Sequence, residues 1–418
     1  EVEHFKTKAP ECILPSMFVD KWKAQDAGDP KAKSRWVVLG WKDPDIMKIR
    51  RSAPTPTAES FMALLAWLAG SGYDGYASDL KNAFAQARKT TRERKLAITL
   101  PRGFRVPGVP DGGLLVLEAE AYGLVSGPMW LRAALNEEII KMGYQQNPYD
   151  KCIYSLKVPH QEAIEGNIML DVDDLVEGGG PAHRKLMDGL YKRYKFGKIL
   201  RIRDAGEAGT LIIGRRVSQN KDYSFKISMK EFAMNRLNPI IVPRGYFSQT
   251  KEVDERMLTK VRGVVGGLNW LAGAGRPDLA AAASTIPGHY GNMDPAMVSD
   301  CNAAVKQAKD IDLTLTVWAI PPAHWRFVVF TDSSTDTSGK ERHQKGYVVG
   351  LSHRDFNAGK QSKVSVLHWK SIKHTRKASS PQLRDAYAAS DALVEGAWVK
   401  CLMESMAWGD YDIVTKRR

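Results

Sequence analysis

Two adjacent acidic residues near the middle of the chain are the first candidates for chemistry. A mostly apolar run at 168–172 leads into Asp173 and Asp174, and an apolar pair leads out toward three glycines at 178–180. This pattern predicts a β-hairpin with both carboxylates at its tip. Crowded carboxylates repel one another, and a hard divalent cation such as Mg²⁺, bound through oxygen, is the usual reason to keep them together. Considered alone, the same residues also fit a plain solvated turn.

A third carboxylate lies upstream. Residues 76–84 predict a short strand that ends near Asp79, followed by a helical turn. Two-metal phosphoryl-transfer sites need carboxylates from separate strand ends that converge on a pair of metal ions. Asp79, Asp173 and Asp174 form such a set, so the sequence predicts a site for two Mg²⁺ or Mn²⁺ ions.

These motifs resemble those of the reverse transcriptases of copia-type LTR retrotransposons. In that family an Asp that precedes an Ala-Phe pair is followed by a hairpin with Val-Asp-Asp, and both motifs occur here in that order. The resemblance implies that Asp79 and Asp173 ligate both metal ions and that Asp174 assists. Asp171 replaces the family's usual aromatic residue. In a strand it faces the same side as Asp173 and adds negative charge near the predicted metal site.

The resemblance extends to residues that would contact a nucleotide. A strand pair at 18–23 and 34–39 resembles the family's fingers hairpin, where Lys33 and Arg35 would meet the incoming triphosphate, because phosphate charge must be neutralised during transfer. A solvated basic strand edge explains either residue equally well. Phe84 resembles the ring that rejects a ribonucleotide's 2′-hydroxyl by clash. The alternative interpretation is that Phe84 is an ordinary core residue on a helical turn.

Three more residues complete the predicted nucleotide site. The turn at 121–130 resembles the family's Leu-Tyr-Gly-Leu segment, and its glycines would let the backbone from Gly123 to Pro128 approach a base pair closely. Val172, beside the acidic pair, is the third. Helix packing alone would also explain the turn.

The second half of the chain resembles the family's thumb and ribonuclease H domain. Residues 261–279 contain the Arg-Pro-Asp of the thumb-like helices, and the pattern changes to strands from Trp325 onward. Asp332 ends one such strand and matches the family's first ribonuclease H acid. Asp385 or Asp391, on the following helix, is the candidate to replace one more acid of that set.

The resemblance therefore implies an α+β fold, a right-hand polymerase of fingers, palm and thumb followed by an α/β ribonuclease H-like domain. The predicted division is 1–222 for fingers and palm, 223–320 for a thumb-like helical and connection region, and 321–418 for an incomplete ribonuclease H-like domain.

Composition agrees with a nucleic-acid partner. The chain has 418 residues, a net charge of +14 and a pI near 9.4. Such an excess of cations favours a polyanion, most often nucleic acid. The four cysteines lie far apart, which predicts neither a zinc site nor a disulfide framework and fits an intracellular location in cytoplasm, nucleus or a retroelement particle. No signal peptide and no membrane-spanning run is predicted, so no membrane partner is expected. The Glu at residue 1 and the abrupt basic end predict a fragment of a polyprotein.

Two hypotheses follow. The first is an RNA-directed DNA polymerase that extends a primer on an RNA or DNA template with deoxynucleoside triphosphates. The second is a decayed, catalytically inactive element that still binds nucleic acid. Asp171, the absent Gln and Arg of the 121–130 turn, and the incomplete ribonuclease H acids motivate the second hypothesis.

Overall fold

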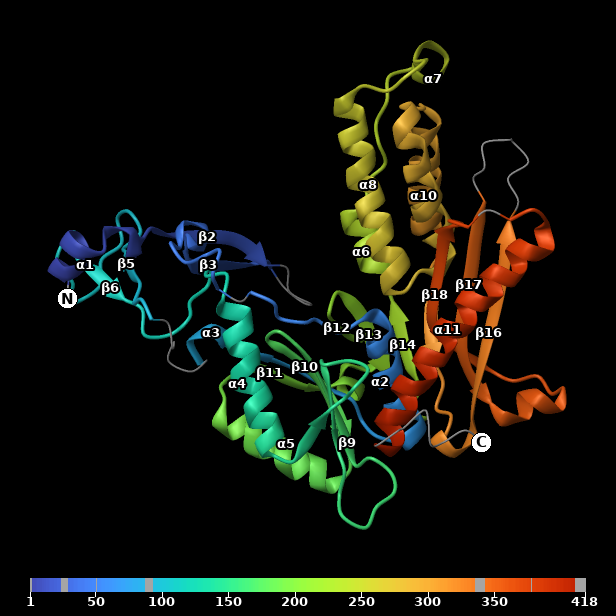
Figure 1. Cartoon of the computed structure of the whole chain (residues 1–418), viewed down its shortest axis with the longest axis horizontal. Coiled ribbons are helices and arrows are strands. Elements are labelled where there is room, and N and C mark those ends of the chain that lie inside the picture. The colour runs from blue at the N-terminus through green and yellow to red at the C-terminus, as the bar shows by residue number, and fades with distance from the viewer. Residues whose placement is uncertain are drawn as a thin grey trace.

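The computed structural model describes residues 2–23, 29–49, 51–86, 93–334, 343–376 and 378–409. Figure 1 shows a central sheet with helices against it, an N-terminal lobe on one side, a projecting helical arm, and a C-terminal unit of strands and one long helix. Within the described ranges, no helix is both long and apolar enough to cross a membrane.

The central sheet has six strands in the order β11-β4-β10-β9-β8-β7. Its strands are β4 (Tyr76–Leu80), β7 (Tyr144–Gln146), β8 (Ile153–Leu156), β9 (Gly166–Asp171), β10 (Asp174–Gly179) and β11 (Phe196–Arg201). The predicted hairpin is confirmed, because β9 and β10 pair antiparallel across a two-residue turn.

Alternate residues of this sheet pack into two different cores, as the two-residue period of a strand requires. Ile168, Leu170 and Leu175 face helices α4 (Gly127–Lys141) and α5 (Pro181–Arg193). Met169 and Val176 face the opposite way, toward helix α2 (Ala58–Ser71). The sheet is therefore covered on both faces.

Helix α2 is the most deeply buried element. Thr57 caps its first turn by accepting a hydrogen bond from the Ser60 amide, and Gly72 ends it in the left-handed conformation. The spacing of Phe61, Leu64, Leu65 and Leu68 in the sequence predicts an apolar stripe on one face, but every residue from Ser60 to Ala69 is buried. A helix that is apolar all round needs cover on all sides. The central sheet supplies one side, and the C-terminal unit supplies the other.

The N-terminal lobe contains the predicted two-stranded ribbon, β2 (Ser16–Lys23) with β3 (Lys31–Val38). A small sheet lies beside it, made of β1 (Ile13–Leu14), β5 (Ala97–Thr99) and β6 (Leu114–Val116). Helix α1 (Val2–Lys8) closes the core of this lobe through Phe5. The short helix α3 (Ala83–Gln86) follows β4 and faces the lobe.

A second sheet carries the helical arm. Its strands are β12 (Thr210–Ile212), β13 (Arg215–Gln219), β14 (Phe225–Ser228) and β15 (Thr314–Val317). The arm consists of α6 (Lys230–Arg236), α7 (Tyr246–Gln249), α8 (Glu255–Ala274), α9 (Ala280–Thr285) and α10 (Ala296–Asp310). Figure 1 shows α8 and α10 side by side, with α7 at the far tip.

The Arg-Pro-Asp segment has a structural role in this arm. The Arg276 side chain is 1% exposed and donates from Nη1 to the Ala308 carbonyl, 2.8 Å away. It also makes a bidentate pair with Asp278, at 2.9 and 2.8 Å. A buried guanidinium needs such partners, and here they join the end of α8 to the end of α10.

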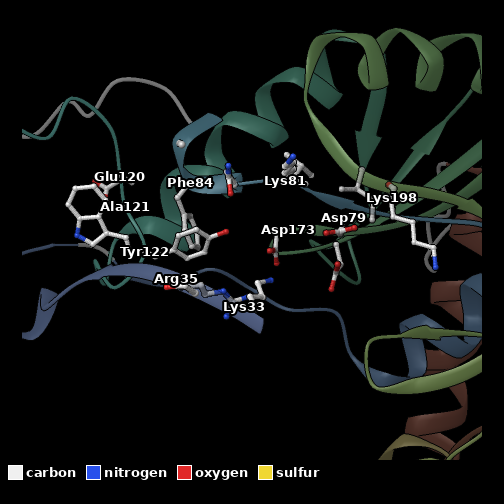
Figure 2. A pocket seen from close by; sticks show the side chains of 18 of the residues that line it. Lys33, Arg35, Asp79, Lys81, Phe84, Glu120, Ala121, Tyr122, Asp173 and Lys198 are labelled. Atoms are coloured by element: carbon white, nitrogen blue, oxygen red, sulfur yellow. The ribbon is translucent and has the colours of Figure 1, made fainter. Parts of the chain in front are cut away.

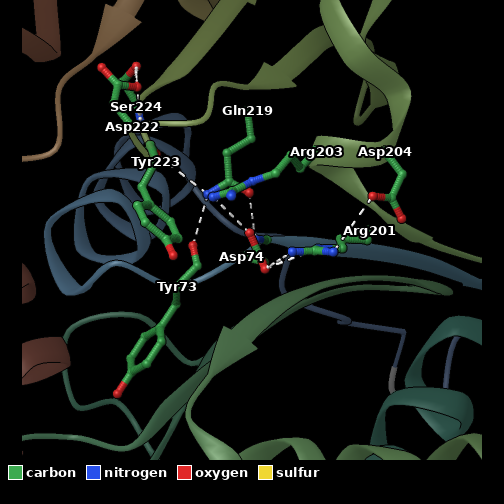
Figure 3. A network of polar contacts seen from close by, with 10 residues as sticks. Tyr73, Asp74, Arg201, Arg203, Asp204, Gln219, Asp222, Tyr223 and Ser224 are labelled. Atoms are coloured by element: carbon green, nitrogen blue, oxygen red, sulfur yellow. Dashed lines mark hydrogen bonds and ion pairs between the residues drawn. The ribbon is translucent and has the colours of Figure 1, made fainter.

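A polar network fastens the second sheet to the central one (Figure 3). Asp74, just before β4, accepts a hydrogen bond from Arg201 Nε at 3.0 Å and pairs with Arg203 at 2.9 Å. Gln219, on β13, accepts from the Gly75 amide at 3.0 Å and donates to the Tyr73 carbonyl at 2.8 Å. These contacts fix where β4 begins relative to the arm.

The C-terminal unit is a three-stranded antiparallel sheet covered by one long helix. It contains β16 (Trp325–Ser334), β17 (Gln344–His353), β18 (Val364–Lys373) and α11 (Pro381–Trp408). The predicted helix after Ser380 is confirmed, with Ser380 as its N-cap.

Polar contacts attach the C-terminal unit to α2 and the central sheet. His368 Nδ1 lies 2.6 Å from Glu59 Oε1 of α2. Asn147 donates to the Ser405 hydroxyl at 2.6 Å, and Asn167 donates to the Met406 carbonyl at 2.9 Å. The C-terminal unit and the central sheet therefore share one core and its polar border.

The Glu59–His368 contact predicts a pH-dependent stability. Burial raises the pKa of Glu59, but the hydrogen bond and charge of His368 outweigh burial and lower that pKa from 4.5 to about 2. A lowered pKa contributes stability above the ordinary carboxyl pKa, and the contribution is lost as pH falls toward the folded value. We expect the parent to lose about 2–3 kcal/mol more than Glu59→Gln between about pH 5 and pH 2, measured by urea unfolding.

The exposed Glu252 offers a matched control. Glu252→Gln should follow the parent's pH profile. Superimposable profiles for the parent and Glu59→Gln would show that the contact does not stabilise the fold.

Candidate active site

Strand pairing brings the three predicted carboxylates to one end of the central sheet. Asp79, in β4, lies directly opposite Asp174 of β10, and Asp174 also lies opposite Asp171 of β9. Asp173 occupies the turn, and its carbonyl accepts a hydrogen bond from the Leu80 amide at 2.9 Å. Figure 2 shows the Asp79 and Asp173 side chains next to each other at the edge of a cavity.

The turn that presents Asp173 is strained. Its two residues are Val172 and Asp173, and Val172 has a φ of +55°. A positive φ at the first turn residue alone is typical of a type II′ hairpin, where glycine is preferred. A β-branched residue there costs about 1–3 kcal/mol and persists only where the surroundings enforce it. Pairing of β10 with strands on both sides supplies that constraint.

A glycine makes room for Asp79. The pairing of β11 with β4 is irregular between Phe196 and Lys198. At Gly197, between them, a Cβ atom would lie 3.1 Å from Asp79 Oδ2. Lys198 lies opposite Asp79 on the side away from Asp174.

The site is electrostatically mixed. Burial raises the pKa of the Asp173 carboxyl, and the nearby charge of Asp79 raises it further. Arg35 and Lys33 act in the opposite direction and lower the same pKa. The Asp173 carboxylate thus faces cations of β3, which lies more than a hundred residues earlier in the sequence.

Asp171 has cations of its own. Burial and the charge of Asp173 raise the pKa of its carboxyl, whereas Arg215 and Arg132 lower it. Both arginines are buried. The extra negative charge predicted at this position is therefore opposed within the fold.

A cavity of about 1300 Å³ opens between the central sheet and the N-terminal lobe. One wall carries Asp79, Asp173 and Asp174, and another carries Lys33 and Arg35. Phe84 lines it as well, so the structure brings together six residues predicted from sequence. Other lining residues are Lys31, Lys81, Tyr122, Lys198 and the tip of the β12–β13 hairpin at 211–213.

Three predicted nucleotide contacts do not line this cavity: Gly123, Pro128 and Val172. Gly123 has a φ of +96°, and a Cβ there would clash with the Val38 carbonyl oxygen. A Cβ at Gly40 would clash with the Gly123 carbonyl in turn. These glycines permit close contact between the turn and β3, and Pro128 opens helix α4.

Tyr122 lines the cavity but is absent from the sequence-based set. Its ring meets the Phe84 ring edge to face, with centroids 4.9 Å apart and planes at 76°. Its position beside Gly123 in the resemblance to Leu-Tyr-Gly-Leu is the signal that could have pointed to it.

The donor set fits a divalent cation in part. Asp79 and Asp173 are close enough for mutual repulsion, which a cation bound through oxygen would relieve. Over the ranges that the structure describes, however, no group of three or more His, Cys, Asp or Glu side chains is arranged to hold a metal ion.

The predicted ribonuclease H acids do not converge. Asp332 lies opposite Gly346, whereas its neighbour Ser333 lies opposite Lys345. Successive strand residues face opposite sides of a sheet. The Ser333 hydroxyl donates to Asp385 at 2.5 Å, and Lys345 pairs with Asp391, so both helix acids lie on the face away from Asp332.

Two basic side chains also lie close to the Asp391 carboxylate. Lys345, only 6% exposed, contacts its Oδ2, and Arg376 lies 3.4 Å from its Oδ1. The hypothesis that Asp385 or Asp391 joins Asp332 in one acidic site is therefore wrong, because strand alternation places Asp332 on the other face of the sheet.

Comparisons with known proteins do not identify the family of this chain. No protein-family model matches the chain, and no curated protein matches it. Crystal structures of the prototype foamy virus protease-reverse transcriptase, native and as a CSH mutant, align over 92% of this chain at 12% identity, with TM-scores of 0.28 and 0.31. The aligned region spans 62% of each of those chains. Values this low establish neither a shared fold nor a shared activity.

The divided acids predict an absence of ribonuclease H activity. Two-metal hydrolysis needs several converging carboxylates, and the described residues of this unit do not assemble them. We expect no cleavage of a labelled RNA–DNA hybrid with Mg²⁺ or Mn²⁺ beyond that of Asp332→Asn. Robust cleavage that disappears in Asp332→Asn would contradict the arrangement of β16 and α11.

Proposed function

We propose that the chain is a nucleotidyltransferase, an RNA-directed DNA polymerase of a retroelement that extends a primer on an RNA or DNA template. One observation carries the proposal. Two carboxylates, Asp79 of β4 and Asp173 of the β9–β10 turn, face Lys33 and Arg35 across a single cavity. Transfer from a triphosphate needs this combination of metal-binding acids and phosphate-binding cations.

Each part of the site has a proposed role. Asp79 and Asp173 would hold Mg²⁺ or Mn²⁺, with Asp174 assisting. Two bound ions would supply activation of the primer hydroxyl and stabilisation of the pyrophosphate leaving group. Lys33 and Arg35 bind the triphosphate of the deoxynucleotide, and their charge offsets its own. Phe84, on the same cavity wall as Tyr122, lies against the sugar.

The remaining units fit this proposal. The β2–β3 ribbon would act as fingers, the central sheet as palm, and the arm as thumb. The net charge of +14 supports binding to the phosphates of a template–primer duplex. The C-terminal unit covers the proposed palm helix α2, and its described acids Asp332 and Asp391 lie on opposite faces of its sheet.

A decayed, inactive element that retains nucleic-acid binding is the second candidate. The absence of a three-ligand acidic group among the described residues favours it. The cations beside Asp171 favour an active site instead, because they oppose the charge that would otherwise disturb the metal ions. Primer extension separates these two candidates.

Asp173→Asn is the direct test of the proposed role. The variant removes one charge without changing side-chain size, so extension on a homopolymer template should fall by at least about 100-fold. Template–primer binding should stay near the parent value, since it rests on many phosphate contacts. That binding should weaken by at least about 100-fold between about 50 and 200 mM salt.

Equal extension by the parent and Asp173→Asn would exclude the polymerase proposal. Binding by a parent that does not extend primers with either metal ion would favour the decayed element.

Gly197→Ala tests whether the position of Asp79 matters. The added methyl would press on Asp79 Oδ2 and displace that carboxylate by a few tenths of an ångström. We expect extension to fall by about ten-fold with little change in melting temperature, because misplaced groups lose rate steeply. Gly189→Ala, where a Cβ meets nothing within 4 Å, is the matched control and should extend like the parent. Parent-like extension by Gly197→Ala would count against Asp79 as a ligand.

A further inference from the structure

The Tyr122 ring contacts two residues that have different roles in the proposed function, Phe84 at the sugar and Arg35 at the triphosphate. On one side its ring lies 4.9 Å from the Phe84 ring, between centroids. On the other, the Arg35 guanidinium lies over the same ring, 5.5 Å from its centroid. Figure 2 shows Tyr122 between Phe84 and Arg35, on the side of the cavity that leads to Asp173.

The backbone of Tyr122 is held firmly. Its carbonyl accepts a hydrogen bond from the Val38 amide at 2.7 Å. The close approach of Gly123 to Val38 and of Gly40 to Gly123 leaves no space for the turn to shift toward β3. Tyr122 is therefore fixed to the strand that carries Lys33 and Arg35.

Phe84, in contrast, lies in a short helix that depends on its neighbours for stability. Helix α3 has only four residues, which is too short to be stable without tertiary contacts. The Phe84 ring is held from one side by Gly127 of α4, where a Cβ would lie 3.3 Å from Cδ1, and from the other by Tyr122. The Phe84 ring also packs against the core between α4 and the central sheet, and removal of the Tyr122 ring would take away one of its contacts.

The phenol group also faces the carboxylates. Burial raises the pKa of Tyr122, and the charges of Asp173 and Asp79 raise it further, while Arg35 and a backbone hydrogen bond at Ala83 lower it. The group is thus neutral, and its ring presents a π face to Arg35, which a cation favours.

We propose that Tyr122 is a specificity-determining positioning residue, whose ring sets both Phe84 against the nucleotide sugar and Arg35 against the triphosphate. This inference rests on the proposed polymerase function. The ligand is the deoxynucleotide, and the Tyr122 ring positions the residues that contact its sugar and its triphosphate. It assigns Tyr122 no contact with the reacting atoms.

The proposal makes a coupled prediction for Tyr122→Leu. Selectivity for deoxynucleotides over ribonucleotides, as a ratio of kcat/KM values, should fall by about ten-fold because Phe84 loses its support. The KM for deoxynucleotides should rise by about three-fold because Arg35 loses its ring. Phe84→Val should change mainly the ratio, and Arg35→Gln mainly KM. Tyr122→Phe keeps the ring and should match the parent in both.

Several results would overturn the inference. An unchanged ratio and KM in folded Tyr122→Leu would do so, as would a Tyr122→Phe variant as impaired as Tyr122→Leu, since the hydroxyl would then be the active group. If Tyr122→Leu fails to fold, Gly127→Ala provides the second test. Its methyl presses on Phe84 from the opposite side and should alter the ratio while leaving KM near the parent value. An unaltered ratio would also overturn the inference.

A binding measurement separates this inference from the proposed function. The full chain is mixed with a template–primer that ends in a 3′-deoxynucleotide, and the affinities for dATP and ATP are measured by fluorescence titration. A preference for dATP that is lost in Tyr122→Leu supports the role of Tyr122 even if the parent extends no primer. An equal preference in both proteins contradicts that role even if the parent is an active polymerase.

Discussion

The antiparallel pairing of β4 with β10 is the constraint on which the site depends, because it sets Asp79 opposite Asp174. Two carboxylates at about 4 Å repel by about 1–4 kcal/mol near a protein surface. Full burial of one Leu or Val side chain stabilises by about 1.5–3 kcal/mol. Leu175 packs toward α4 and α5, and Val176 packs toward α2. A one-residue slip would exchange these faces, so apolar burial holds the register and outweighs the repulsion at its end.

Local sequence patterns allowed prediction of the strands and helices. The contacts of their side chains depend on packing against residues that are distant in the sequence. The hairpin around Asp173, the β2–β3 ribbon and the helix after Ser380 follow from alternation, turn residues and capping, which lie within a few positions of one another. The surroundings of Gly123 depend on Val38, which is far away in the sequence. The separation of Asp332 from Asp391 depends on which face of a sheet a helix covers, and no periodicity within β16 reveals that choice.

The unusual Asp171 has an explanation that a single motif cannot give. Arg215, 5% exposed, donates from Nε to the Ala274 carbonyl at 2.8 Å and lies over the Phe61 ring. Burial lowers the pKa of this guanidinium to about 10, while the charges of Asp171 and Glu59 raise it. One buried cation thus opposes the added carboxylate and caps the last turn of α8, where a cation is favoured. The acidic hairpin and the base of the arm are stabilised by the same side chain.

The burial of α2 also has a consequence for how the chain is made. On the order of 300 residues lie between α2 and α11, and a ribosome adds about 5–20 residues per second, so roughly 15–60 s pass before the cover of α2 is synthesised. During that time the run from Phe61 to Ala69, apolar on every side, has no complete partner. The surface of α2 that faces α11 is therefore covered only after α11 has been synthesised.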